Sequence, residues 1–173
     1  MPDSQSGKSR LRVIKSAPAT ICRPSAARCD LRLISPDSRA DHRRVILFAC
    51  YQRAVRQSLV AALLRQGWRI VWCDDGDTAM RYLASERPDL VITGMMMPNR
   101  DGLELIRSVL GLYPALPIMA LAEERDPMSR AYLRYAVLSG AASAHTAPVN
   151  IATFLSDLEH ILGNGERAIQ TAV

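Results

Sequence analysis

Short apolar runs alternate with longer amphipathic segments along most of this chain, and this alternation constrains the fold more than any other feature. Five runs rich in aliphatic and β-branched residues are typical of buried strands: 45–49, 69–73, 90–93, 117–121 and 142–145. After each run, apolar residues recur at helical spacing, over 54–66, 78–86, 103–112, 127–139 and about 150–162. Because parallel strands need crossover helices, we predict a doubly wound, five-stranded parallel sheet, a flavodoxin-like (βα)5 fold of the α/β class.

Capping residues mark the expected ends of these helices. Gly67 and Gly140 follow helical segments as C-terminal caps, and Asp75 or Asp77 and Asn150 precede others as N-terminal caps. On the fourth helix we expect the apolar face to carry Met128, Ala131, Leu133 (or Tyr132) and Val137. The sequence Gly163-Asn-Gly165 is expected to end the last helix.

The folded part is expected to cover residues 43–162, with a tail on each side. Residues 1–42 are rich in Ser, Pro, Ala and Arg and carry most of the net charge of +5, so we expect a disordered basic N-terminal tail. One patch in it, Leu11–Ile14, could pair with a sheet edge, although we do not predict that it does. Residues 163–173 form a short C-terminal tail. Because the charge is not gathered on the folded part, nucleic-acid binding is disfavoured.

Cysteine usage and hydropathy indicate a cytoplasmic protein. Cys22, Cys29, Cys50 and Cys73 form no C-x-x-C pair and have no ligand spacing with histidine, so reduced thiols are expected, and no metal or other cofactor. No apolar run approaches the length of a membrane span, and the N-terminus has no apolar core of a secretory signal.

The stretch Asp89-Leu-Val-Ile-Thr-Gly-Met-Met-Met-Pro98, followed by Asn99-Arg-Asp-Gly102, places a loop after a buried strand, where open α/β sheets have their functional sites. This stretch resembles the central strand and loop of response-regulator receiver domains of two-component signalling. Further matching segments are Leu103-Glu-Leu-Ile106, Leu116-Pro-Ile118 and Ser139-Gly-Ala141. The resemblance covers about residues 43–162.

This resemblance implies a phosphorylation site at the carboxyl edge of the sheet. In the family an aspartate accepts the phosphoryl group, an acidic pair helps it to hold Mg²⁺, and a hydroxyl and a lysine complete the site. Here the acceptor position is Gly94, the acidic pair is Cys50 and Tyr51, the hydroxyl position is Ala122 and the lysine position is Ala147. The aromatic switch position is Ala144. We therefore expect a degenerate receiver that has no phosphoacceptor, no metal and no enzymatic activity, with Tyr51 filling the vacated space.

Several functions fit such a domain. Our first hypothesis is a module that signals by phosphorylation-independent protein–protein interaction. We expect it to be stand-alone, since few residues follow the last helix. Its partner would be a histidine kinase, another regulator, an output protein or a second copy of the chain. We expect the partner to bind the face of the fourth helix, last strand and last helix. Candidate contact residues on this face are Arg130, Arg134, Tyr135 and Ala144. One alternative is a small-ligand site lined by Cys50, Tyr51, Met95, Ala122 and Ala147. Another is a conventional phosphorelay response regulator, which the overall resemblance favours.

Overall fold

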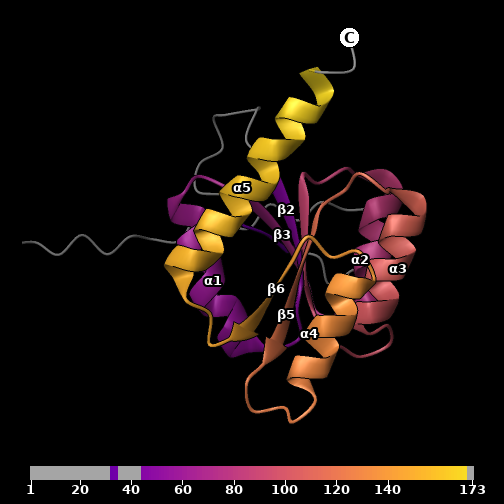
Figure 1. The fold of residues 1–173 in the computed structure, drawn as a ribbon, viewed down its shortest axis with the longest axis vertical. Helices are drawn as coiled ribbons and strands as arrows, with labels where there is room; N and C mark the ends of the chain where they lie inside the picture. Colours follow the sequence, from indigo (N-terminus) through magenta and orange to yellow (C-terminus); the bar gives the residue numbers. More distant parts are fainter. Residues whose placement is uncertain (1–31, 35–43, 171–173) are drawn as a thin grey trace, which may run out of the picture.

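A central parallel sheet organises the molecule, as predicted. The computed structural model describes residues 32–34 and 44–170. Five strands run parallel: β2 (Val45–Ala49), β3 (Arg69–Cys73), β4 (Leu90–Gly94), β5 (Ile118–Glu123) and β6 (Ser143–Ala147). The sheet order is β1-β3-β2-β4-β5-β6, so the chain winds outward from β2 in both directions (Figure 1). The flavodoxin-like fold is confirmed.

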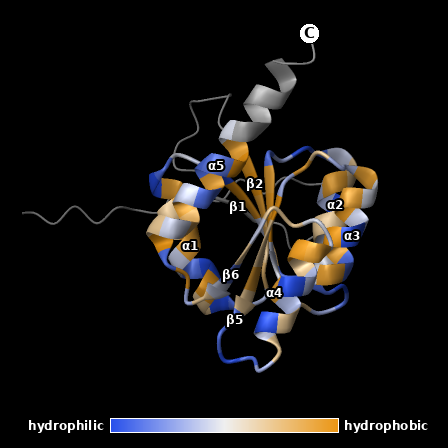
Figure 2. Ribbon diagram, in the orientation of Figure 1, coloured by the Kyte–Doolittle hydropathy of each residue, from blue (hydrophilic) through white to orange (hydrophobic). Residues whose placement is uncertain are grey.

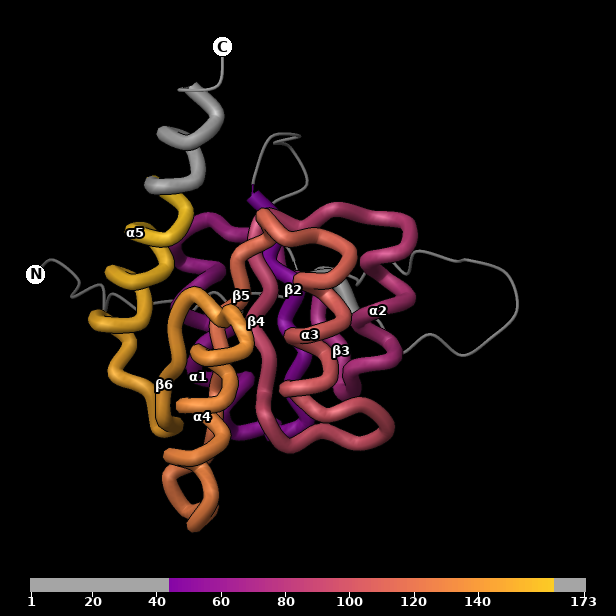
Figure 3. The backbone as a smooth tube through the Cα atoms, turned by 45° about the vertical axis from the view of Figure 1, so that its right-hand side comes forward, coloured from indigo at the N-terminus to yellow at the C-terminus, as the bar shows by residue number. Residues whose placement is uncertain are grey.

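Helices cover both faces of the sheet. Helices α1 (Arg53–Arg65) and α5 (Ile151–Gln170) lie on one face, and α2 (Gly76–Ser85), α3 (Gly102–Leu112) and α4 (Ser129–Leu138) lie on the other (Figures 1 and 3). Two apolar cores result, one under each layer of helices. Phe48 and Phe154 belong to the core beneath α1 and α5, whereas Leu47 and Leu105 belong to the core beneath α2, α3 and α4. Most of the sheet lies toward the hydrophobic end of the colour scale, whereas β6, with the sequence Ser-Ala-His-Thr-Ala, is paler (Figure 2).

The predicted caps explain where several helices begin and end. Asp75 accepts a hydrogen bond from the Thr78 amide at 2.8 Å, and Asn150 accepts one from the Ala152 amide at 3.0 Å. Gly67 and Gly140 have φ values of 85° and 105°, the left-handed conformation that ends a helix most easily with glycine.

One strand lies outside the predicted pattern. Strand β1 (Arg32–Ile34) pairs antiparallel with β3 at the edge of the sheet. The sequence did not predict it, because three residues inside a polar, proline-containing segment give no periodic signal. The apolar patch Leu11–Ile14, Cys22 and Cys29 lie outside the described residues.

The structure also corrects two helix predictions. Helix α5 does not end at Gly163 but continues to Gln170, because glycine costs a helix only about 1 kcal/mol and good helix formers follow. Met128, which directly precedes α4, and Val137 are 53% and 51% exposed rather than packed on the sheet. The expected Leu133 and Tyr132 do pack against the core, together with Ala136, which the predicted face did not include.

Among the described residues, no helix is both long enough and apolar enough to cross a bilayer.

Candidate functional site

The carboxyl edge of the sheet gathers the positions that the sequence singled out. Cys50 directly follows β2, Gly94 ends β4, and Ala147 ends β6. The strand register pairs Ala49 with Thr93, Gly94 with Leu121 and Ala122 with Thr146, so these strand ends are neighbours. The fold therefore brings the backbone of the predicted site together.

The space beside Gly94 is occupied by side chains of this chain. A Cβ atom placed on Gly94 would lie 3.3 Å from Gln52 Oε1 and 3.4 Å from Cys50 Sγ. These two groups also bond to each other, because the Cys50 thiol donates to Gln52 Oε1 at 3.3 Å. The end of β4 is thus covered by a thiol and an amide.

Tyr51 does not fill this space, contrary to our expectation. Its side chain is 61% exposed, whereas Cys50 is fully buried. The neighbouring Gln52 provides the filling group instead. Gln52 is the N-cap residue of α1, yet its side chain makes no capping hydrogen bond. Sequence reasoning missed it, because a glutamine at a helix start normally indicates a solvated position.

The residues suggested for a small-ligand site do not share one lining. Cys50 packs in the core beneath α1 and α5, whereas Met95 and Ala122 pack in the core on the opposite face of the sheet. Ala147 is 6% exposed at the end of β6, and Tyr51 points toward solvent. Cys50 thus packs on the opposite face of the sheet from Met95 and Ala122, and Tyr51 is exposed.

Burial keeps the Cys50 thiol protonated. Desolvation raises its pKa to about 11, and the negative charges of Glu123 and Asp74 act in the same direction. A backbone hydrogen bond from Gln52 and the positive charge of Arg56 oppose that rise only in part. At neutral pH this thiol is a hydrogen-bond donor and not a nucleophile.

A partly buried guanidinium lies next to the site, and no sequence pattern predicted it. Arg56 Nη1 is 2.8 Å from Asp74 Oδ1 and 3.4 Å from the Cys50 carbonyl oxygen. The guanidinium lies 3.3 Å from the centroid of the Trp72 ring, in a cation–π contact. Asp74, an acid at the end of β3, is therefore already paired. The arrangement joins the start of α1 to the loop after β3.

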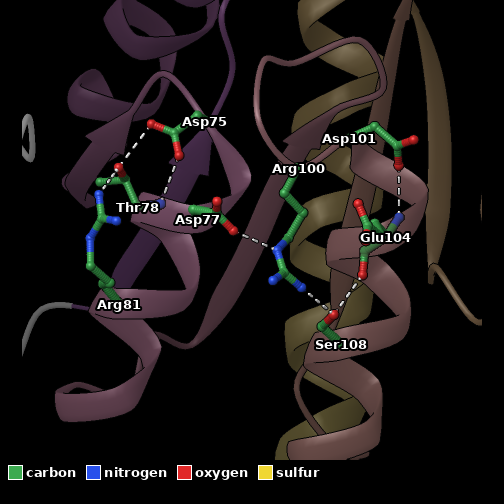
Figure 4. A network of polar contacts seen from close by, with 8 residues as sticks. All are labelled: Asp75, Asp77, Thr78, Arg81, Arg100, Asp101, Glu104 and Ser108. Atoms are coloured by element: carbon green, nitrogen blue, oxygen red, sulfur yellow. Dashed lines mark hydrogen bonds and ion pairs between the residues drawn. The ribbon is translucent and has the colours of Figure 1, made fainter.

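A second arginine fixes the loop between β4 and α3. Arg100 Nε lies 2.9 Å from Asp77 Oδ1 on α2, and its Nη1 donates to Ser108 Oγ on α3 at 2.7 Å (Figure 4). Asp101 caps α3 by accepting from the Glu104 amide at 2.8 Å. The loop is thus tied to both flanking helices.

The face formed by α4, β6 and α5 carries the other predicted residues. Arg130, Arg134 and Tyr135 are exposed on α4, whereas Ala144 is half-buried in β6. Besides Tyr135 at 56%, Leu138 is 73% exposed. His145 of β6 lies 3.3 Å from Asp157 of α5 and stacks edge-on against Phe154, which joins the strand to the helix. This face combines exposed apolar and basic groups.

Within the part of the chain that the structure describes, no three His, Cys, Asp or Glu side chains cluster as ligands of a metal ion would.

Comparison with known proteins gives one consistent result. The family model of the response regulator receiver domain matches residues 51–143. The response regulator MprA of Mycobacterium tuberculosis is 40% identical over 84 residues, which are 49% of this chain and 36% of that protein. MprA of Mycolicibacterium vanbaalenii is equally similar. The chain thus spans about a third of the length of these curated relatives.

Solved structures agree with this fold. The receiver domain of an HD domain-containing protein from Pseudomonas fluorescens Pf-5 superimposes with a TM-score of 0.65 at 24% identity, covering 72% of this chain and 98% of that one. A CheY-like receiver domain protein from Methanospirillum hungatei JF-1 gives a TM-score of 0.65 at 17% identity, covering 73% and 98%. Because the family model matches more than half of the chain and the fold agrees with it, the chain belongs to the response regulator receiver domain family.

Proposed function

We infer that this receiver domain signals through protein–protein contacts without being phosphorylated. The observation that carries this proposal is the end of β4, where Gly94 offers no carboxylate and where Gln52 and Cys50 occupy the adjoining space. Phosphoryl transfer to a receiver needs a nucleophilic carboxylate at that point. Here the nearest groups are a neutral amide and a protonated thiol, so the attacking group is missing.

The donor set also does not fit Mg²⁺. This ion prefers carboxylate oxygens and water in octahedral geometry. The two positions after β2 supply a buried thiol at Cys50 and an exposed phenol at Tyr51. Asp74 could supply oxygen, but it already pairs with Arg56 at 2.8 Å. A cation at this carboxylate would compete with the positive charge of the Arg56 guanidinium.

The surface best suited to a partner is the face of α4, β6 and α5. Tyr135 and Leu138 expose apolar area next to Arg130 and Arg134. Aromatic residues and arginine are enriched where proteins contact each other. The partner would be a signalling protein, such as a histidine kinase, another regulator or an output protein, or a second copy of the chain.

Conventional phosphorelay signalling is the competing function, and the similarity to MprA speaks for it. The deciding experiment incubates the full chain with a small phosphoryl donor and Mg²⁺, then measures intact mass. We expect no phosphoryl adduct. A variant with the five family residues restored (Cys50→Asp, Tyr51→Asp, Gly94→Asp, Ala122→Thr, Ala147→Lys) serves as the control for donor activity. A stoichiometric adduct on the unmodified chain would refute the proposal.

The docking face has a separate test. Leu138→Glu places a charge in the exposed apolar area of α4, and Arg107→Glu places one on the exposed surface of α3 as a matched control. We expect Leu138→Glu to weaken binding to a cognate kinase or regulator at least about tenfold, as loss of a central contact does. The Arg107→Glu variant should bind like the unmodified chain. Equal affinities for both variants would exclude this face.

A further inference from the structure

The outer edge of β3 is a surface that the proposed function does not use. In the five-stranded parallel sheet, β3 is the terminal strand on one side, and β1 covers it. The pairing is antiparallel, with Arg32 opposite Trp72, Leu33 opposite Val71 and Ile34 opposite Ile70. The backbone of this edge thus accepts an extended segment as a partner.

The β3 strand has little protection of its own against pairing with other strands. Its last four residues, Ile70-Val-Trp-Cys73, are buried and apolar, and they include no proline or lysine. Natural sheets usually protect an edge by charges, proline, bulges or a covering segment. Here the covering segment is β1, which is only three residues long.

Geometry indicates that β1 covers the edge of its own chain. Ile34 is level with Ile70, which is level with Ile46 near the start of β2, so β1 ends two strand spacings from where β2 begins. That separation is about 10 Å, and residues 35–44 can span it without extension, since each residue reaches more than about 3 Å. A tether of this kind holds β1 at an effective concentration of about millimolar.

We propose that the β3 edge is a strand-docking surface whose alternative occupant is the β3 edge of a second copy of this chain, and that β1 keeps the two copies apart. Two β3 strands can pair antiparallel about a twofold axis, because each then offers the other the same backbone donors and acceptors that it offers to β1. At micromolar concentrations the tethered β1 outcompetes the second copy. Loss of β1 leaves the apolar edge open.

The test uses the full chain with β1 disabled. Replacing Arg32→Gly, Leu33→Ser and Ile34→Gly removes strand propensity. The matched control, Leu11→Gly, Arg12→Ser and Val13→Gly, alters a segment of nearly the same composition in the same tail. All chains also carry Leu138→Glu, which suppresses association through α4. Any dimer that remains therefore does not use the docking face of the proposed function, so the two proposals can fail separately.

Sedimentation over about 5 to 500 µM, a range that brackets weak pairing, should show a dimer only for the β1 variant. Hydrogen exchange should show its β3 amides, residues 69–73, still protected at high concentration and more exposed on dilution. A peptide of residues 30–36 should return the dimer to monomer. If the variant precipitates, recovery of a soluble monomer by the same peptide supports the proposal. A β1 variant that stays monomeric throughout, or a peptide without effect, overturns it.

Discussion

Two glycines at the carboxyl edge of the sheet should differ sharply in how well they tolerate substitution by alanine. At Gly94, a new Cβ would meet Gln52 Oε1 at 3.3 Å and Cys50 Sγ at 3.4 Å, both at the ends of side chains that can move by a few tenths of an ångström. Its backbone is not left-handed, so Gly94→Ala also gains about 0.4–1 kcal/mol from the restricted unfolded chain. We expect a stability within about 1 kcal/mol of the original.

At Gly102 the same methyl group has no room. It would collide with the carbonyl oxygen of Gly94 and lie 2.8 Å from Met95 Cα, and both are backbone atoms. The Gly102 amide already donates to Met95 O at 2.9 Å, so this approach is part of the loop. Overpacking against backbone costs about 1–3 kcal/mol or more, and we expect Gly102→Ala to lose at least about 2 kcal/mol.

A third glycine supplies the control. Gly111 lies in the same helix as Gly102, and a Cβ there would meet nothing within 4 Å. Gly111→Ala should therefore stabilise the protein by about 0.5–1 kcal/mol, the ordinary helix preference for alanine. Urea unfolding followed by circular dichroism measures all three free energies of unfolding. If Gly102→Ala is as stable as Gly111→Ala, the close approach of the loop to α3 is wrong. A loss above about 2 kcal/mol for Gly94→Ala would mean that Gln52 and Cys50 cannot yield.

Three further predictions concern charged groups. Burial lowers the pKa of His145 below its usual 6.5, against the opposing charge of Asp157. As the pH falls, the unfolded chain therefore binds a proton before the folded chain does, and the free energy of unfolding should decrease from about pH 6.5 downward. Urea titrations at several pH values should show a smaller decrease for His145→Asn. Arg56→Met should lower the free energy of unfolding by about 1–2 kcal/mol, because the contact with the Trp72 ring is lost. A double-mutant cycle with Asp74→Asn should give a coupling energy below about 1 kcal/mol, because Asp74 is 42% exposed. Arg100→Gln should accelerate hydrogen exchange in residues 95–101 more than in β4, because the loop loses its ties to α2 and α3; equal rates in the loop would contradict this role.

The fold was predictable because its signals are local and repeated. Each parallel strand is an apolar run, and residues such as Asp75, Asp101 and Asn150 cap helices through bonds to amides two or three positions away. The family positions at the strand ends came from the resemblance to receiver domains, and the strand register then places these ends side by side. Strand β1 was not predictable, because its pairing with β3 is formed by backbone atoms of a segment without periodicity.

The filling of the site could be predicted less well than its backbone. Tyr51 and Gln52 are adjacent, and nothing in the sequence says which of them turns inward. The exposed phenol of Tyr51 can keep its hydroxyl in water. The Gln52 amide oxygen instead turns inward and accepts a hydrogen bond from the Cys50 thiol at 3.3 Å. The contact of Arg56 with Trp72 likewise joins α1 to β3 across a loop, beyond the reach of helical or strand periodicity.

The loops around the site have consequences for how such a domain can be regulated. A ligand shifts a conformational equilibrium only as far as it binds the two states differently. In a conventional receiver the phosphoryl group and its cation provide that difference. Here Arg56 pairs with Asp74, Arg100 ties the β4–α3 loop to two helices, and Gln52 covers Gly94, so contacts within the chain hold the loops at this edge. If the proposed function holds, the chain presents one interaction surface permanently, and control must come from the partner, from the amount of protein, or from a contact away from this edge, such as β1 on β3.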